Sequence, residues 1–236
     1  MEDYLANACS ENEKQFYDAE NNSIEWIDLE NWGRKKLFMN YLGADFPYIV
    51  VTANVDVTKP LAFAKKHGIS FNLVMIYLCT RTADSIENYR YRFVDRKPFI
   101  IGHTRPFVTH LRKGSDLFVM GECIRPCDDI VRFCKTTREN LENATPEDLE
   151  NRVRGKLDIA NYSSIPWIQY TGFIRTIIHG GEDNVPKITF GKYFKDPADP
   201  TRTLMPLSNQ THHGLMDGLH VGRFYQALQK ACDELE

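Results

Sequence analysis

The feature that most constrains the fold is a series of strand-like segments near the C-terminal end of the chain. They span residues 165–176, 187–194 and 203–213, and no helical pattern separates them. The first two are rich in aromatic and β-branched residues, which favour strands. Helical patterns occupy much of the remaining chain. The sequence therefore predicts a two-layer α/β sandwich with a mixed sheet, rather than a doubly wound parallel sheet.

Strand and helix patterns alternate from Ile24 onward. Further strands are expected at 24–29 and 47–57, and several short ones between Tyr89 and Ile124. The expected helices are 32–42 with Asn31 as N-cap, 58–68 ending at Gly68, 71–86 with Ser70 as N-cap, 127–144 and 219–235. No linker or repeat interrupts this order. We expect a polar leader over residues 1–23 and a single domain over 24–236.

Charge and hydropathy exclude several classes of function. The chain has 29 basic and 32 acidic residues and a net charge of −3, which provides no electrostatic footprint for nucleic acid or an anionic membrane. The longest apolar run, Leu73 to Leu78, is far shorter than the roughly 18 residues that span a bilayer. The N-terminus has no signal-peptide pattern, so a cytoplasmic protein is expected. No glycine-rich phosphate-binding loop begins a helix.

The six cysteines do not predict a metal site. In a cytoplasmic protein they are expected to be reduced. Cys123 and Cys127 are separated like half of a zinc site, but no second pair has matching spacing. Because structural zinc requires four ligands, no metal is predicted.

A histidine pair near the C-terminus carries the most specific chemical signal. His212 and His213 end a predicted strand, and Asp217 and Gly218 follow before the last helix. A neutral histidine at such a position can remove a proton from a hydroxyl group. Asp217 can cap the helix or pair with an arginine. A single histidine is more often a surface or core residue, so the motif alone leaves both interpretations open.

The sequence around this motif resembles the chloramphenicol acetyltransferase family. Residues 204–234 resemble the family's C-terminal active-site segment. The segments ITFGKYF, IPWIQYTGF and IEWIDLENWGRKKLFMNYL resemble three earlier family blocks in the family's order. The similarity extends from about Ile24 to Asp233. It implies the family fold and an acetyl-CoA-dependent O-acetyltransferase.

The resemblance also implies roles for individual residues. His213 matches the general base that deprotonates the acceptor hydroxyl, and no acyl-enzyme forms. Asp217 matches an aspartate that pairs with an arginine, here Arg34, and Thr189 matches a threonine that contacts the tetrahedral intermediate through water. Tyr41 matches an aromatic residue of the acceptor pocket, and Tyr193 matches a tyrosine of the coenzyme tunnel. The family assembles as a homotrimer with active sites between subunits, and we expect the same here.

Gly172 departs from the family pattern. Alignment of Pro166, Trp167 and Phe173 places this glycine where the family has a serine that donates a hydrogen bond to the developing oxyanion. Loss of one such donor typically lowers kcat by about 10²–10³. The sequence therefore predicts another donor, a slow enzyme or a different acceptor.

The favoured function is acetylation of chloramphenicol, and hence antibiotic inactivation. One alternative is acetylation of another hydroxylated acceptor, or a role like the acyltransferase core of 2-oxoacid dehydrogenase complexes. The absence of a lipoyl domain from the sequence counts against that core. A second alternative is a weakly active or non-catalytic homologue that binds small ligands between subunits. Gly172 favours this second alternative, whereas His213, Asp217 and Arg34 oppose it.

Overall fold

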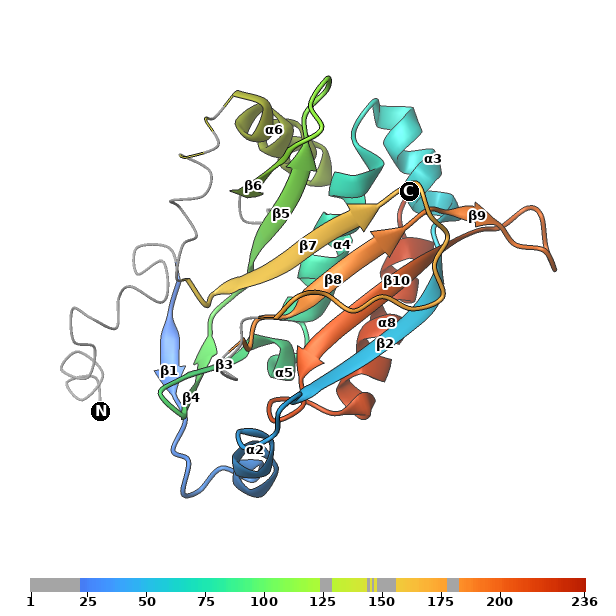
Figure 1. Ribbon diagram of the computed structural model, residues 1–236. Helices are drawn as coiled ribbons and strands as arrows, with labels where there is room; N and C mark the ends of the chain where they lie inside the picture. Colours follow the sequence, from blue (N-terminus) through green and yellow to red (C-terminus); the bar gives the residue numbers. More distant parts are fainter. Residues whose placement is uncertain (1–21, 124–128, 144, 146, 148–155, 178–182) are drawn as a thin grey trace.

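The centre of the computed structural model is a seven-stranded sheet (Figure 1). The structure describes residues 22–123, 129–143, 145, 147, 156–177 and 183–236. In spatial order the strands are β2 (Tyr48–Asp56), β10 (Thr203–His212), β8 (Lys187–Gly191), β7 (Ile159–Ile165), β5 (Arg105–Leu111) and β6 (Phe118–Glu122), with β9 (Phe194–Lys195) beside β10. β7 runs parallel to β5 and β8, and the other pairs are antiparallel. The predicted mixed sheet is confirmed.

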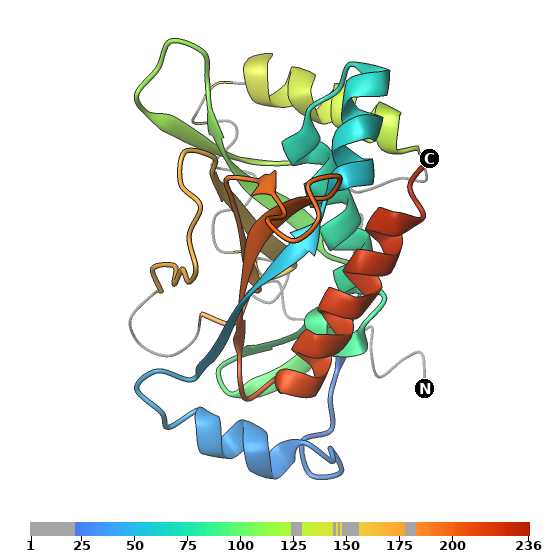
Figure 2. The same cartoon turned by 90° about the vertical axis from the view of Figure 1, so that its right-hand side faces the viewer.

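The long helices cover one face of this sheet, as Figure 2 shows. They are α3 (Thr58–His67), α4 (Phe71–Asp84), α6 (Ile130–Asn143) and α8 (Gly218–Asp233). Their apolar residues and alternate residues of the strands form one large core. The other face of the sheet carries no helix among the described residues, and we call it the open face. The two-layer α/β sandwich is therefore confirmed.

Helix α4 lies at the centre of the helical layer. Its residues from Leu73 to Thr80 are all buried, as its almost wholly apolar sequence predicts. The Ser70 hydroxyl accepts a hydrogen bond from the Leu73 N–H at 3.5 Å, which confirms the predicted N-cap.

A small second sheet and two short helices stand at one end of the molecule. The sheet has the order β1 (Ile24–Trp26), β4 (Lys97–Ile101) and β3 (Tyr91–Val94), and the helices are α2 (Lys35–Tyr41) and α5 (Glu87–Arg90). The Gly102 N–H donates to the Ser23 carbonyl, and the Asn22 amide donates to the His103 carbonyl. The remainder of the predicted leader, residues 1–21, lies outside the described residues.

The predicted strand over 165–176 is wrong. The strand in this region is β7, which ends at Ile165, and Pro166 and Trp167 form a turn. Proline has no N–H to continue a strand ladder. Residues 168–177 then cross the open face without joining the sheet (Figure 2). The aromatic pattern of this segment reflects packing on the sheet, because Tyr170 lies against Gly191, where a Cβ atom would stand 2.9 Å from its ring.

The first predicted strand and helix are shorter than expected. The Asp28 carboxylate accepts hydrogen bonds from the Glu30 N–H and the Asn31 side chain, which form a turn after β1. Asn31 is therefore not the N-cap, and α2 follows Arg34 instead. The predicted helix over 127–144 begins at Ile130 in the described residues, and Cys127 lies outside them.

Cys79, Cys134 and Cys232 are buried thiols without disulfide bonds.

Candidate active site

The histidine motif forms a tight loop between β10 and α8. His212 is the last residue of β10, and Asp217 is the N-cap of α8. The His213 N–H donates to the Pro47 carbonyl at 2.7 Å, and the Gly214 N–H donates to His212 Nδ1 at 3.1 Å. A Cβ atom on Gly214 would lie 2.9 Å from the His212 ring, so only glycine fits here without displacing that ring.

Arg34 holds this loop through four hydrogen bonds. Its Nη1 and Nη2 atoms donate to the two Asp217 carboxylate oxygens at 2.7 and 2.6 Å. Nε donates to the Gly214 carbonyl at 2.8 Å, and Nη2 also donates to the His213 carbonyl at 3.0 Å. The hydrogen bonds from Arg34 lower the pKa of Asp217, although burial opposes them. The structure therefore joins Arg34 and Asp217 as the sequence predicts, and the arginine also fixes the backbone on both sides of Gly214.

The His213 imidazole is fixed on one face and along one edge. The Tyr41 ring stacks on it with a centroid distance of 4.2 Å and an interplanar angle of 12°. His213 Nδ1 lies 3.2 Å from the Met216 carbonyl oxygen and 3.4 Å from Asp217 Oδ1. Both oxygens can only accept, so Nδ1 carries a proton, and in the neutral ring the lone pair is on Nε2. The side chain is 29% exposed, which leaves the ring accessible to a substrate.

The neighbouring His212 has a different environment. It is 1% exposed and packs edge-on against Phe93 and Tyr48, at centroid distances of 5.0 and 5.7 Å. Burial, together with the nearby His213, lowers the pKa of His212 to about 4. His212 therefore supports the loop as a neutral side chain.

His220 is a site residue that the sequence analysis missed. Its Nδ1 accepts a hydrogen bond from the Asp217 N–H at 3.0 Å. It stands at position N3 of α8, where a glutamate or glutamine usually completes a capping box with an N-cap aspartate. The spacing of Asp217 and His220 is thus a signal that sequence reasoning could have used.

The remaining predicted residues gather elsewhere, around Ser208 on the open face. Thr189 pairs in register with Ser208, and the Ser208 hydroxyl donates to the carbonyl of Phe173, next to Gly172. The Thr189 hydroxyl is buried and has no hydrogen-bond partner in the structure. Gly172 is exposed, and a Cβ atom there would meet nothing within 4 Å.

Tyr193 lies near this second group, in a cavity of about 670 Å³ that we call the Tyr193 cavity. Its lining includes Ser163, Trp167, Gly191 and Arg175. Such a volume is typical of a small-molecule site. His213 is not part of this lining.

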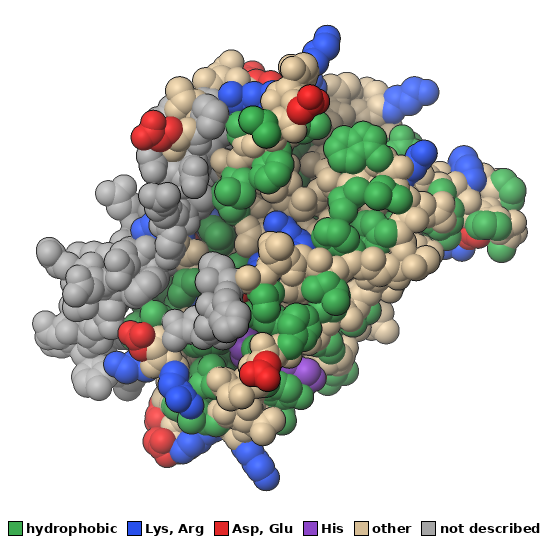
Figure 3. All heavy atoms as spheres, viewed as in Figure 1, with side chains coloured by type: hydrophobic (Ala, Val, Ile, Leu, Met, Phe, Trp, Pro, Cys, Tyr) green, Lys and Arg blue, Asp and Glu red, His purple; other side chains and the backbone are tan. Residues whose placement is uncertain are grey.

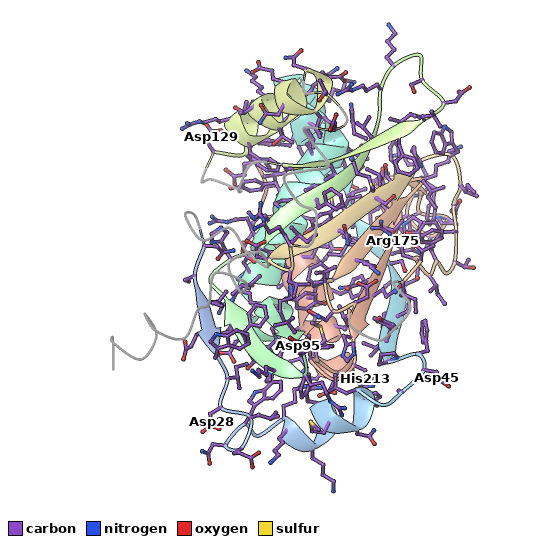
Figure 4. All side chains as sticks on the ribbon, turned by 60° about the vertical axis from the view of Figure 1, so that its left-hand side comes forward. Asp28, Asp45, Asp95, Asp129, Arg175 and His213 are labelled. Carbon is purple, nitrogen blue, oxygen red and sulfur yellow. The ribbon has the colours of Figure 1, made fainter. Side chains whose placement is uncertain are left out.

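Two groups of predicted residues are therefore separate within one chain. Arg34, Tyr41, His213 and Asp217 surround the loop, whereas Thr189, Gly172 and Tyr193 lie on the open face. His213 follows Ser208 by five residues, which is roughly 16 Å along an extended strand. Figure 4 places His213 beside α2, away from Arg175 on the open face.

In the described parts of the chain, no cluster of three metal-ligating side chains occurs. Within the same residues, none of the helices has the length and apolar character needed to cross a bilayer.

Comparison with known proteins identifies relatives over most of the chain. The sequence profile of the chloramphenicol acetyltransferase family matches residues 22–229. A chloramphenicol acetyltransferase of Clostridium perfringens is 29% identical over 214 residues, which cover 89% of this chain and 95% of that protein. Chloramphenicol acetyltransferase 2 of Haemophilus influenzae is 28% identical over 215 residues, with 89% and 97% covered.

Solved structures agree with these matches. A chloramphenicol acetyltransferase structure superposes with a TM-score of 0.80 at 25% identity and covers 91% of this chain and 100% of its own. The cubic core of the pyruvate dehydrogenase multienzyme complex superposes with a TM-score of 0.61 at 19% identity, which shows a shared fold alone. Fold and sequence together define an acyltransferase. Because the family profile spans nearly the whole chain, the protein belongs to the chloramphenicol acetyltransferase family.

Proposed function

We propose that this protein transfers the acetyl group of acetyl-CoA to a hydroxyl group of chloramphenicol, with His213 as the general base. His213 Nε2 takes the proton of the acceptor hydroxyl, and the acceptor oxygen attacks the thioester carbonyl carbon. The carbon–sulfur bond then breaks, and the proton passes from His213 to the departing CoA sulfur. The products are the acetyl ester and CoA, and no acyl-enzyme forms.

The observation that carries this proposal is the geometry of the His213 ring. The Met216 carbonyl and Asp217 fix the proton on Nδ1, and the stacked Tyr41 fixes the plane of the ring. Arg34 holds the backbone from which the ring projects. A positioned base of this kind typically contributes about 10²–10⁴ to the rate.

We also propose a homotrimer with each active site shared between two subunits. The separation of the two groups of predicted residues supports this assembly, because His213 of one copy could meet Thr189, Gly172 and Tyr193 of another. The open face supports it as well. Figure 3 shows hydrophobic side chains gathered there, and Trp167, Ile168 and Ile174 are each more than half exposed. Exposed apolar residues in such number favour an interface.

The open-face residues would complete the chemistry. The unpartnered Thr189 hydroxyl supports a role at the tetrahedral intermediate through a water molecule. The Tyr193 cavity would receive the pantetheine arm of acetyl-CoA. Gly172 supplies no side-chain donor to the oxyanion, so turnover with chloramphenicol should be slow. We place the enzyme in the cytoplasm as a single domain over residues 24–236, where it would inactivate the antibiotic.

The test is the release of CoA thiol from acetyl-CoA in the presence of chloramphenicol. Wild type should release thiol only when the acceptor is present. His213→Ala should lower kcat by about 10²–10⁴ with its circular dichroism spectrum unchanged. His67→Ala, at the exposed end of α3, is the matched control and should retain full activity. Near-wild-type turnover in His213→Ala would overturn the proposed mechanism.

A further inference from the structure

A second cavity on the open face lies on the opposite side of Thr189 from Tyr193. Lys187, Thr189 and Gly191 are alternate residues of β8 and face the same way, because Ile188 and Phe190 between them belong to the core. Gly191 lines the Tyr193 cavity, whereas Lys187 lines a cavity of about 470 Å³ that we call the Lys187 cavity. Arg175 lines both cavities. Thr189 therefore lies between two adjoining spaces.

This arrangement is suited to a ternary complex of the protein with acetyl-CoA and the acceptor. The acceptor hydroxyl and the thioester must meet at one point, so the two substrates approach it from different sides. If acetyl-CoA occupies the Tyr193 cavity, the Lys187 cavity remains for the acceptor. This step rests on the proposed function.

One polar side-chain atom that borders the two cavities has no hydrogen-bond partner among the described residues, and it belongs to Arg175. The Lys187 ammonium contacts the Asp183 carboxylate and donates to the Thr176 carbonyl at 2.9 Å, so Lys187 and Asp183 neutralise each other. The backbone N–H of Arg175 donates to Gln210 Oε1 at 2.9 Å, which ties this residue to β10. Its side-chain Nη1 is buried and has no hydrogen-bond partner.

An unpaired buried guanidinium N–H is costly and requires an explanation. Burial lowers the pKa of Arg175, although the charge of Asp183 opposes this effect. The planar guanidinium matches the oxygens of a carboxylate or phosphate, with which it forms short charge-assisted hydrogen bonds. A neutral acceptor could offer this N–H only a weaker hydrogen bond than an anionic group does.

We propose that the Lys187 cavity selects hydroxylated acceptors that carry an anionic carboxylate or phosphate group, and that Arg175 binds this group. Arg175 is then a specificity-determining residue. Chloramphenicol has no such group and offers the arginine only neutral oxygen acceptors, which form weaker hydrogen bonds, so it should be the poorer substrate. The positive charge of Arg175 would also attract an anionic acceptor into this cavity, in which Lys187 and Asp183 already form an ion pair.

The experiment compares acceptors that differ only in this charge. N-benzoyl-serine and N-benzoyl-threonine are tested against their methylamides, which keep the hydroxyl but lose the carboxylate. In the thiol-release assay we expect wild type to favour the acids over the amides by at least about tenfold in kcat/KM. Arg175→Met, which keeps the apolar stem, should remove most of this preference, and Arg175→Lys should retain part of it. Arg132→Met, on an exposed position of α6, is the matched control and should keep the preference.

Calorimetric titration with the same acids, without acetyl-CoA, measures binding to the cavity independently of acetyl transfer. Binding that is lost in Arg175→Met supports the inference even where no thiol is released, and in that case only the proposed function fails. Equal use of acids and amides by wild type, or a preference that persists in Arg175→Met, would overturn the inference and leave chloramphenicol acetylation intact. A loss of the trimer in Arg175→Met would also overturn it, because the arginine would then pair with a neighbouring subunit.

Discussion

At the scale of single residues, the two adjacent histidines, His212 and His213, have different roles. His213 presents a partly exposed ring with a free Nε2, whereas His212 is buried and supports the Gly214 N–H. The end of the strand explains the difference, because His212 is the last residue of β10 and packs against Phe93 and Tyr48, whereas His213 begins the turn that Arg34 holds. Gly172 shows a different effect, since a missing side chain there leaves open space next to Phe173, whose carbonyl accepts a hydrogen bond from Ser208.

Gly172→Ser should raise the rate of chloramphenicol acetylation by about tenfold or more, if the hydroxyl reaches the developing oxyanion. The gain should appear in kcat more than in KM, because this hydrogen bond strengthens in the transition state. The open space at Gly172 means that the serine side chain fits without moving its neighbours. Steady-state kinetics with Gly172→Ala as control separates the effect of the serine hydroxyl from the effect of the added carbon atom. Equal gains in both variants would show that the oxyanion donor is another group.

His212 should make the fold sensitive to acid. Its pKa is about 4 in the folded protein, against 6.5 as its ordinary value. Below pH 6.5 the unfolded chain binds a proton at this histidine and the folded chain does not, so the free energy of unfolding decreases toward pH 4. The loss is roughly 3 kcal/mol for a shift of this size.

His212→Asn tests this pH dependence, because asparagine can still accept from the Gly214 N–H but does not titrate. Urea unfolding at several pH values should show that the stability advantage of wild type over the variant shrinks between pH 6.5 and 4. A constant difference across this range would contradict the assigned pKa.

At the scale of elements, a single arginine connects the start of α2 to the loop before α8. The Arg34 side chain is 10% exposed and that of Asp217 is 35% exposed, so the pair is only partly screened from water. Its strength comes from the two parallel hydrogen bonds and from the backbone carbonyls that the same guanidinium binds.

Asp217→Asn should lower the free energy of unfolding at pH 7 by about 1–2 kcal/mol, a value reduced for the exposure of the carboxylate. It should also lower kcat, because the loop that positions His213 loosens. The pKa of Asp217 is depressed in the folded protein, so its contribution is present above pH 3.8 and disappears as the pH falls further. Thermal unfolding from pH 7 to pH 3 should therefore bring wild type and variant together at the acidic end. Asp45→Asn, in an exposed position before β2, is the control and should change neither stability nor activity.

The sequence predicted the elements whose pattern is local and strong. The apolar run with Ser70 as cap gave α4, and the β-branched run 47–57 gave β2. It failed where tertiary packing decides the structure: the aromatic segment after Pro166 packs on the sheet without pairing, and the strand of this region, β7, ends just before that proline. The pairing of Arg34 with Asp217 came from family resemblance, since no local pattern connects residues so far apart. The stacking of Tyr41 on His213 and the bond from Asp217 to His220 required coordinates.

At the scale of the whole molecule, the proposed assembly should determine activity. We expect a particle of about three times 27.3 kDa by light scattering, with activity that falls on dilution below the assembly constant. Ile174→Asp, on the exposed apolar face, should dissociate this particle and abolish turnover, whereas Ile174→Val should preserve both. A stable and active monomer would contradict the trimer and the shared site.

A mixing experiment tests the sharing directly. His213→Ala and Thr189→Val each damage a different half of the site, so each homotrimer should have low activity. Unfolding and refolding the two variants together should restore part of the activity, because some sites then combine His213 from one copy with Thr189 from another. Hybrid trimers confirmed by mass spectrometry but without recovered activity would show that each site lies within one chain.

The pairing of β10 with β2 has a consequence for how the protein is made. These strands are about 150 residues apart, yet β10 also pairs with β8 and carries the histidine loop that Arg34 binds. During translation the ribosome releases α2 and β2 early and β10 near the end. Until β10 is synthesised, the sheet of the nascent chain lacks the strand between β2 and β8. The unpaired edges of β2 and β8 can then pair with other chains. A chain truncated before β10 should aggregate rather than fold into an enzyme of lower activity. The same last segment therefore completes both the active-site loop and the sheet.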